Sequence, residues 1–175
     1  MIRPARPEDM DGLLKLNRTY CQQAYKGFDV LCTMPDDQAV ASTYGQWLTD
    51  PQVRMPLLYL DDKMAAFSVY RLPALDPGEI LSLEYTPDVS LTDVQALVDS
   101  ILKDMTHLDS DIVQVWLLRD NLRARFYYQQ FGFKPAGGVK QTVVGDLSLQ
   151  YTRYIYRLRE HPSEYLQQAQ EDFEM

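Results

Sequence analysis

The fold of this chain is decided by a stretch of thirteen residues, Asn121-Leu122-Arg123-Ala124-Arg125-Phe126-Tyr127-Tyr128-Gln129-Gln130-Phe131-Gly132-Phe133. Asn121, or Asp120 before it, is a favourable N-cap, because a short polar side chain can accept a hydrogen bond from a free N–H of the first helical turn. Gly132 stands where helices commonly end in the left-handed conformation. We therefore predict a helix that runs through Phe131 and ends there.

The segments on either side of this helix have the patterns of strands. Residues 112–118 are nearly all apolar, as expected of a strand that is covered on both faces. After the helix, residues 139–144 and 147–158 flank Gly145-Asp146, a pair that favours a hairpin turn. The C-terminal half is therefore predicted to be a strand, a helix and a hairpin.

Helical and strand-like periods also alternate in the N-terminal half. The helices expected there begin at Pro7, Pro35 and Leu91. The strands expected there span residues 1–3, 55–60, 64–72 and 79–85. Because the two periods are mixed without a linker or a repeat, we expect one α/β (α+β) domain over residues 1–158. Residues 159–175 are expected to form an acidic C-terminal helical tail.

The composition limits the classes of partner. The chain has 175 residues, of which 17 are Lys or Arg and 25 are Asp or Glu, so its formal net charge is −8. Such a surface repels nucleic acid and anionic membranes, and it attracts cations such as amines. The sequence has no apolar run near the roughly 18 residues of a membrane span and no signal-peptide pattern. We therefore expect a cytoplasmic protein that binds neither nucleic acid nor membrane.

The cysteines and histidines do not indicate a metal centre. There are two of each, Cys21 and Cys32, and His107 and His161. Their spacing matches no zinc motif, so no metal is expected. Without a CxxC pair, the two thiols are expected to be reduced.

Residues 121–133 resemble the C-terminal cofactor motif of the GNAT superfamily of N-acetyltransferases, which is written loosely as N-x-x-A-x-x-[aromatic]-Y-x-x-x-G-F. Every fixed position of that motif matches. The resemblance implies a mixed, splayed central sheet with helices on both faces. The sheet opens between the strand that ends near Tyr85 and the strand that ends near Leu118.

The resemblance further implies acetyl-CoA as co-substrate, lying in the splayed part of the sheet. The amides of its pantetheine arm would pair with the backbone of residues 83–85, as an added strand does. For Asn121, a plain helix cap is the alternative to cofactor binding. The cofactor-binding residues expected on this basis are Leu83, Tyr85, Asn121, Arg123 and Ala124.

In this family picture a primary amine attacks the acetyl group directly, and Tyr128 donates its proton to the departing sulfur. A phenol with a pKa of about 10 is protonated at neutral pH, which suits an acid. The alternative is that Tyr128 only packs in the core. Glu79 and Glu84 are the candidate general bases, and strict alternation along their strand would put them on opposite faces. An exposed charge at the strand edge is the alternative for each.

One family feature is missing, the glycine-rich loop that binds the CoA pyrophosphate. At the corresponding place the chain has Ser90, Leu91, Asp93 and Gln95, and no glycine occurs between Glu79 and Gly132. Backbone N–H groups cannot approach a phosphate closely across such side chains. Residues 90–93 instead have the form of a capping box.

Arginines of the motif region offer other partners for the phosphates. They are Arg119, Arg123 and Arg125, and solvated surface side chains are the alternative for each.

Two functions remain open from the sequence. The first is an N-acetyltransferase that moves an acetyl group from acetyl-CoA to a primary amine of a small molecule or peptide. The second is a non-catalytic GNAT-like binding or assembly module, in which the acidic tail packs on another subunit, as in a homodimer.

Overall fold

A computed structural model describes residues 1–26, 35–74, 77–144 and 147–160. Its eight-stranded sheet has the order β1-β3-β4-β5-β6-β8-β7, and β2 pairs with β4. The strands are β1 (Ile2–Pro4), β2 (Val53–Arg54), β3 (Pro56–Leu60), β4 (Lys63–Arg71), β5 (Gly78–Tyr85), β6 (Ile112–Leu118), β7 (Lys134–Val144) and β8 (Leu147–Arg157). The helices are α1 (Met10–Ala24), α2 (Asp37–Thr49), α3 (Leu91–His107) and α4 (Leu122–Gln130), with 3-10 turns at Pro7–Asp9 and Leu158–Glu160.

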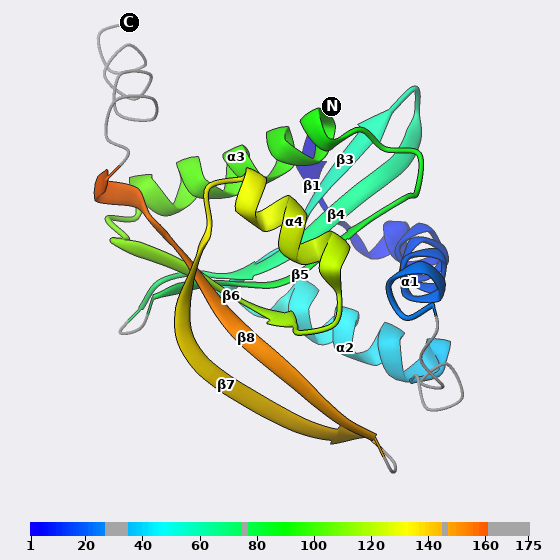
Figure 1. Cartoon of the computed structure of the whole chain (residues 1–175). Coiled ribbons are helices and arrows are strands. Elements are labelled where there is room, and N and C mark those ends of the chain that lie inside the picture. The colour runs from blue at the N-terminus through cyan, green and yellow to red at the C-terminus, as the bar shows by residue number, and fades with distance from the viewer. Residues whose placement is uncertain (27–34, 75–76, 145–146, 161–175) are drawn as a thin grey trace, which may run out of the picture.

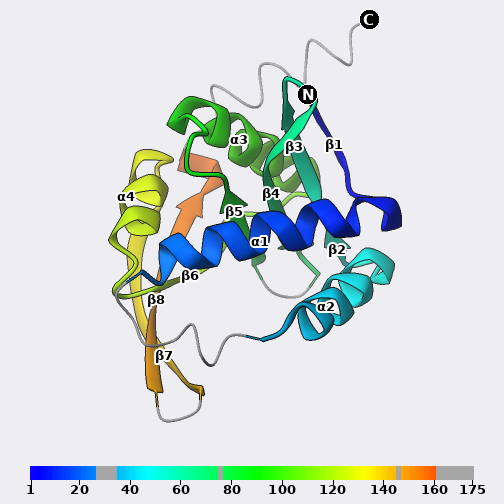
Figure 2. The same ribbon diagram turned by 90° about the vertical axis from the view of Figure 1, so that its right-hand side faces the viewer.

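The sheet separates two layers of helices, α3 and α4 on one face and α1 and α2 on the other (Figures 1 and 2). Each face has its own hydrophobic core. The core under α3 and α4 includes Leu97, Ile101 and Phe133, and the core under α1 and α2 includes Leu13 and Phe67. All five side chains are almost completely inaccessible to solvent. The predicted mixed sheet with helices on both faces is thus confirmed.

Local signals set the ends of the helices. The side chains of Asp36, Ser90 and Asn121 accept hydrogen bonds from the N–H groups of the first turns of α2, α3 and α4. Gly132 ends α4 with φ of 91°, and a Cβ there would lie 3.0 Å from the ring of Tyr156. Asn121, rather than Asp120, is therefore the cap of the motif helix.

The β7–β8 hairpin differs from its prediction in length. β7 begins at Lys134, whereas the sequence pattern indicated a start at residue 139. A bulge interrupts the pairing of β7 with β8 between Pro135 and Val139. This segment contains a proline and two glycines, so its sequence resembles a loop. The hairpin turn at 145–146 and the C-terminal segment 161–175, which holds most of the predicted tail, lie outside the described residues.

The sheet opens between its two central strands. β5 and β6 are parallel and pair only through Gly78–Ile80 with Val113–Val115. β5 also pairs with β4, and β6 with β8, in antiparallel fashion along most of their lengths. The last residues of β5, including Leu83 and Tyr85, therefore have no pairing with β6. The splay implied by the family resemblance lies where it was expected.

Candidate functional site

A cavity of about 190 Å³ lies at the mouth of this splay. Three segments far apart in the sequence meet there, the end of α1, the end of β5 and the loop that leads into α4. The cavity is lined by Tyr20, Gln23, Ala24, Lys26, Tyr85, Asp120, Asn121, Leu122 and Arg123. Three of these residues, Tyr85, Asn121 and Arg123, were predicted as cofactor-binding, and those from α1 were not.

Aromatic rings form one wall of the cavity. The rings of Tyr85 and Tyr127 stack with centroids 5.2 Å apart, and Tyr20 packs edge-on against Tyr85 at 5.2 Å. The guanidinium of Arg123 lies over both stacked rings, 5.1 Å from Tyr85 and 5.3 Å from Tyr127. Burial raises the pKa of Tyr85 to about 12, although the charge of Arg123 acts in the opposite direction. This stack joins β5 to α4 across the splay.

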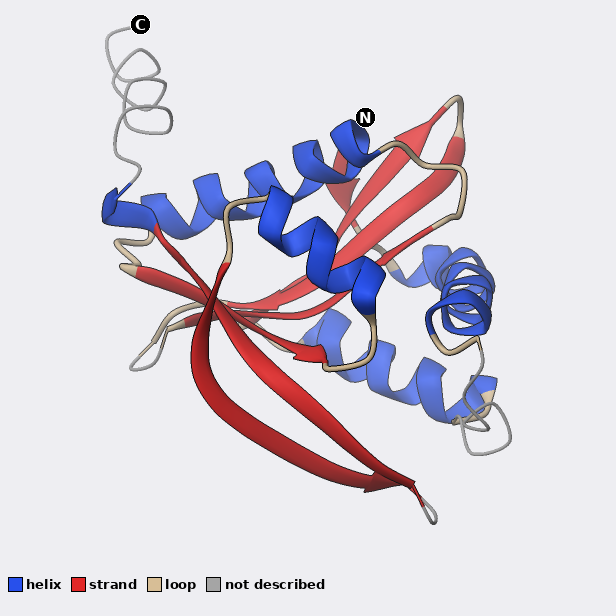
Figure 3. Cartoon of the chain, viewed as in Figure 1, coloured by secondary structure: helices blue, strands red, loops and turns tan. Residues whose placement is uncertain are grey.

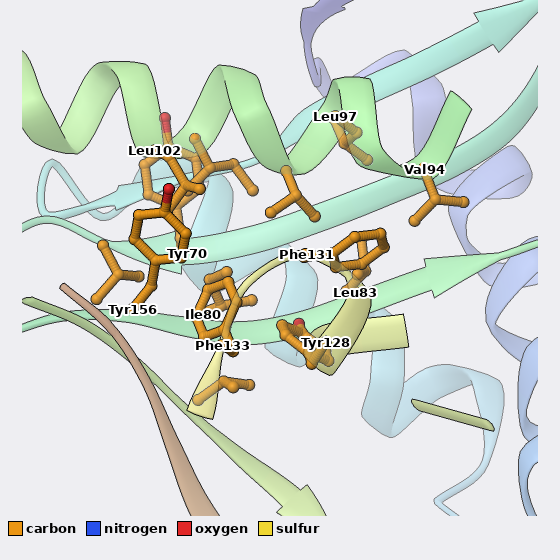
Figure 4. Packing of buried hydrophobic residues seen from close by; sticks show 14 of the residues in the cluster. Tyr70, Ile80, Leu83, Val94, Leu97, Leu102, Tyr128, Phe131, Phe133 and Tyr156 are labelled. Carbon is orange, nitrogen blue, oxygen red and sulfur yellow. The ribbon is translucent and has the colours of Figure 1, made fainter. Parts of the chain in front are cut away.

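Tyr128 lies behind this wall, in the core between α4 and β5. Its ring packs edge-on against Phe131 and Phe133, with centroid distances of 5.9 and 5.1 Å. Figure 4 shows Tyr128 and Phe131 beside Leu83 of β5. Burial raises the pKa of Tyr128, and the neighbouring Tyr85 acts in the same direction. Tyr128 is therefore a protonated donor at physiological pH, close to the Tyr85 end of β5.

Glu84 is a buried carboxyl group on the other face of β5. Its Oε2 accepts from Nδ2 of Asn17 at 2.9 Å, and its Oε1 accepts from the hydroxyls of Ser82 and Tyr44 at 2.9 and 3.2 Å. Burial raises the pKa of Glu84, and these three hydrogen bonds act against that rise. Glu84 thus connects β5 to α1 and α2, and its partners on the two helices were not predicted.

Strict alternation does not hold along β5, which corrects the expected placement of the two glutamates. The register passes from Val69↔Ser82 to Tyr70↔Ile80, so one extra residue of β5 forms a bulge. Ile80 and Leu83, three residues apart, consequently both lie in the core on the α3 side. Glu79 and Glu84 therefore share the opposite face.

Glu79 lies away from the mouth of the splay. It pairs with Arg71 of β4 and Gln114 of β6, where the strands are still joined. Glu84 follows it by five steps along the strand, a distance of at most about 16 Å. Of the two candidate bases, the structure brings Glu84 to the cavity end of β5.

The other expected cofactor-binding residues lie at the start of α4. Oδ1 of Asn121 accepts from the N–H of Ala124 at 3.1 Å, so the predicted cap is confirmed. Ala124 is buried. Asn121 also lines the cavity, so its role as a cap does not remove it from the reach of a ligand.

The start of α3 has the structure of a capped helix. Oγ of Ser90 accepts from the N–H of Asp93 at 3.1 Å, as the capping box requires. The second bond differs from the prediction, because the Asp93 carboxylate accepts from the Ser90 hydroxyl at 2.6 Å rather than from its N–H. Val89 and Val94 are buried in the core beside this turn.

These residues therefore fit one part of CoA and not another. The unpaired end of β5 and the cavity fit the pantetheine arm. The start of α3 does not fit a pyrophosphate, since Leu91 and Asp93 occupy the glycine positions and the Asp93 N–H is already bonded. The arginines considered as substitutes have protein partners: Arg119 donates to Gln150, Arg125 to Tyr154, and Arg123 covers the aromatic wall.

Two further expectations concern metals and thiols. In the part of the chain that the structure describes, no group of three or more His, Cys, Asp or Glu residues could hold a metal ion. Cys21 is a free thiol whose pKa is raised by burial to about 12. Cys32 lies outside the described residues.

Among the helices that the structure describes, none is long and apolar enough to cross a membrane.

Comparisons with known proteins identify the fold. No protein-family model and no curated protein matches the sequence. Among solved structures, an N-acetyltransferase from Staphylococcus aureus Mu50 superposes with a TM-score of 0.71 at 13% identity, over 91% of this chain and 97% of that one.

Two other solved structures are similar to the same extent. The PaiA N-acetyltransferase from Thermoplasma acidophilum in complex with coenzyme A has a TM-score of 0.69 at 16% identity, over 90% of this chain and 98% of that one. A chimera of the spermidine N-acetyltransferase SpeG from Vibrio cholerae and hSSAT has a TM-score of 0.73 at 14% identity, over 94% of this chain and 98% of that one. These likenesses establish a shared fold.

Proposed function

We propose that this chain, which has the fold of the GNAT N-acetyltransferases, moves an acetyl group from acetyl-CoA to a primary amine. The observation that carries the proposal is the splay between β5 and β6 with a cavity at its mouth. The unpaired edge of β5 lies at that place, and Tyr128 and Glu84 are buried near the same end of β5, on its two opposite faces. Proteins of this fold with named acceptors include a spermidine N-acetyltransferase.

The edge of β5 would hold the thioester arm. Beyond Ile80 its backbone groups on the β6 side have no strand partner, so amides of an extended ligand can pair with them. Asn121 and Arg123, which line the cavity, would bind polar groups of the same arm. We assign no step to the phosphates, because the start of α3 does not fit them.

Glu84 would receive the proton of the attacking amine, directly or through water. An alkyl amine with a pKa of about 10.4 is mostly charged at pH 7 and must lose a proton before it attacks. Burial raises the pKa of Glu84, which makes it a stronger base than an exposed carboxylate. The net charge of −8 would favour a cationic acceptor, whether a small polyamine or a peptide amine.

Tyr128 would donate a hydrogen bond to the departing sulfur. In the reaction a C–N bond forms, the C–S bond breaks, and the electron pair of that bond stays on sulfur. A thiol has a pKa of about 8.5, below that of a phenol, so the thiolate is a weaker base than the Tyr128 phenolate. Tyr128 therefore stabilises the leaving group as a donor and need not give up its proton completely.

A transfer assay tests this proposal. The purified chain would be incubated with acetyl-CoA and either spermidine, a lysine-containing peptide or an uncharged amide, with released thiol and the acetylated product both measured. We expect thiol release that depends on an amine and gives product in equal amount. Thiol release equal to buffer for every amine, with no acetylated product, would contradict the proposal.

A second candidate function is a binding or assembly module without catalysis. The stacking of Tyr85 on Tyr127 under Arg123 favours it, since these side chains join the two walls of the splay. The capped start of α3 favours it as well. The two functions differ in thioester binding, because the module would bind neither acetyl-CoA nor its pantetheine fragment.

A further inference from the structure

A second cavity, of about 240 Å³, is lined by residues of β7 and β8 and by the 3-10 turn after β8. Figure 3 shows β7 and β8 as two long neighbouring strands. It shares no lining residue with the cavity at the splay. The end of β8 that borders it pairs with Ile112, at the start of β6, whereas the splay cavity lies beyond the end of that strand. The other β8 residues that line it, Ile155 and Arg153, pair with Gln114 and Trp116 of the same strand. The residues that line it are Gly132, Lys134, Pro135, Ala136, Arg153, Ile155, Arg157 and Glu160.

The charge of this cavity is opposite to that of the whole chain. Acidic residues outnumber basic ones by 25 to 17 in the sequence. The cavity instead has three cations, Lys134, Arg153 and Arg157, and one carboxylate, Glu160. Nε of Arg157 lies 3.7 Å from Glu160, and both side chains are more than half exposed, so this ion pair is weak and Arg157 can turn to another anion. The carboxylate still offsets one of the three positive charges. Two positive charges remain.

Arg153 has an unused donor. Among the described residues, its Nε is one of two buried side-chain polar atoms without a hydrogen-bond partner. Its Nη2 is 3.5 Å from the carbonyl oxygen of Ala136, at the limit of a hydrogen bond. A guanidinium has five donors in a rigid plane that match two oxygens of a phosphate or carboxylate. A buried donor left unpaired is costly, so an acceptor that reaches the Nε of Arg153 would be favoured.

A bulge in β7 lies beside the cavity. β7 pairs Pro135 with Tyr154 and next Val139 with Thr152, so three residues of β7 stand opposite Arg153 alone. Gly137 and Gly138 follow this path with φ of 73° and 92°, a region that favours glycine.

The arginines of β8 all point away from the core. Arg153 and Arg157 alternate with Tyr154 and Tyr156, which are buried on the α3 and α4 side. The two arginines therefore share the other face of β8. The sheet thus places both arginines on one face of β8, beside the bulge in β7.

We propose that this cavity binds the phosphate group of a small phosphorylated molecule. A phosphate monoester carries about −1.5 to −2 charges at pH 7, which complements the two positive charges that remain. A carboxylate also offers two oxygens to one guanidinium, but it carries only one charge. The arginine forks supply paired donors, and Lys134 supplies a point charge. This site is independent of acyl transfer.

Inorganic phosphate is the probe for the test. The full chain, labelled with ¹⁵N, would be titrated with phosphate at pH 7 and constant ionic strength, and the arginine Nε–Hε signals followed by NMR. Arg153→Lys keeps the charge and identifies the Arg153 signal by its loss. We expect a saturable shift of that signal. Arg157→Gln should weaken phosphate binding by about tenfold, which corresponds to about 1.4 kcal/mol.

The matched control is Arg71→Gln, an exposed arginine that does not line the cavity, and it should leave binding unchanged. A linear shift that sodium chloride reproduces would overturn the proposal. So would equal binding by the wild type and Arg157→Gln, each shown to be folded by its unfolding temperature. Acetate should bind more weakly than phosphate, and the reverse order would contradict the charge argument.

Discussion

Glu84 shows how a single residue can serve both packing and chemistry. Its carboxyl group is buried under α1 and α2, where ionisation is unfavourable unless donors compensate. Asn17, Ser82 and Tyr44 supply three hydrogen bonds, yet burial remains the larger effect and raises its pKa above the ordinary value of 4.5. The residue is thus fixed in place and titrates at a higher pH than an exposed glutamate.

Glu84→Gln should make the stability of the protein less dependent on pH. Because the pKa of Glu84 is higher in the folded chain than in the unfolded one, the folded chain binds the proton more tightly. The stabilisation by that proton is complete below about pH 4.5 and is lost as pH rises through the raised pKa. Urea unfolding at several pH values should show this decline in the wild type and a smaller one in Glu84→Gln.

Glu79→Gln is the matched control, since Glu79 lies on the same strand without the buried partners. It should keep the decline of the wild type. A decline of the same size in Glu84→Gln would show that Glu84 does not cause it.

Tyr128→Phe should lower kcat for acetyl transfer by about 100-fold or more, the contribution typical of a positioned proton donor. The ring contacts with Phe131 and Phe133 remain, so the unfolding temperature should change little. Tyr154→Phe removes another buried hydroxyl, one that accepts from Arg125, and should leave kcat unchanged. Equal kcat values for Tyr128→Phe and the wild type would limit Tyr128 to packing.

Some residues of the candidate site could be predicted from the sequence, and others could not. Asn121 and Gly132 follow from local rules of helix ends, and Tyr128 followed from the motif. Tyr20 and Tyr44 could not be placed, because no spacing within a helix shows which distant strand its residues will contact. Asn17 gave a weak signal, as a polar residue on the otherwise apolar face of α1.

At the scale of elements, helix starts could be predicted and the β5 bulge could not. Ser90 and Asp36 are caps that need only their own first turn. The bulge is a property of the pairing between β4 and β5, and no glycine or proline at Leu81-Ser82 marks it. The expectation that the two glutamates face opposite ways failed for that reason.

Ser90→Ala should destabilise the protein by about 1 kcal/mol, because the N–H of Asp93 loses its acceptor. Glycine is tolerated at a cap, so Ser90→Gly should cost only a few tenths of a kcal/mol. Urea unfolding of both variants beside the wild type measures the difference. If Ser90→Ala were as stable as the wild type, the capped start of α3 would not contribute to folding.

At the scale of the whole molecule, the thirteen-residue motif and the order of the expected helices and strands together predicted the mixed sheet, its splay and both helical layers. The strand order, with β8 between β6 and β7, was not predicted, because hydrophobic periods do not show which strands are neighbours. The cavity beside β7 and β8 could not be predicted from the sequence. It depends on a bulge in β7 and on the proximity of Lys134 and Arg153, which are 19 residues apart in the sequence.

The central claim is that the splay holds a thioester arm although the start of α3 offers no pyrophosphate cradle. Calorimetric titration with acetyl-CoA and with S-acetylpantetheine, at low and at moderate salt, tests it most directly. We expect both compounds to bind, with dissociation constants within about tenfold of each other, or about 1.4 kcal/mol, and with little effect of salt. Failure of both to bind at millimolar concentration would contradict it, and so would acetyl-CoA binding that is far tighter and strongly weakened by salt.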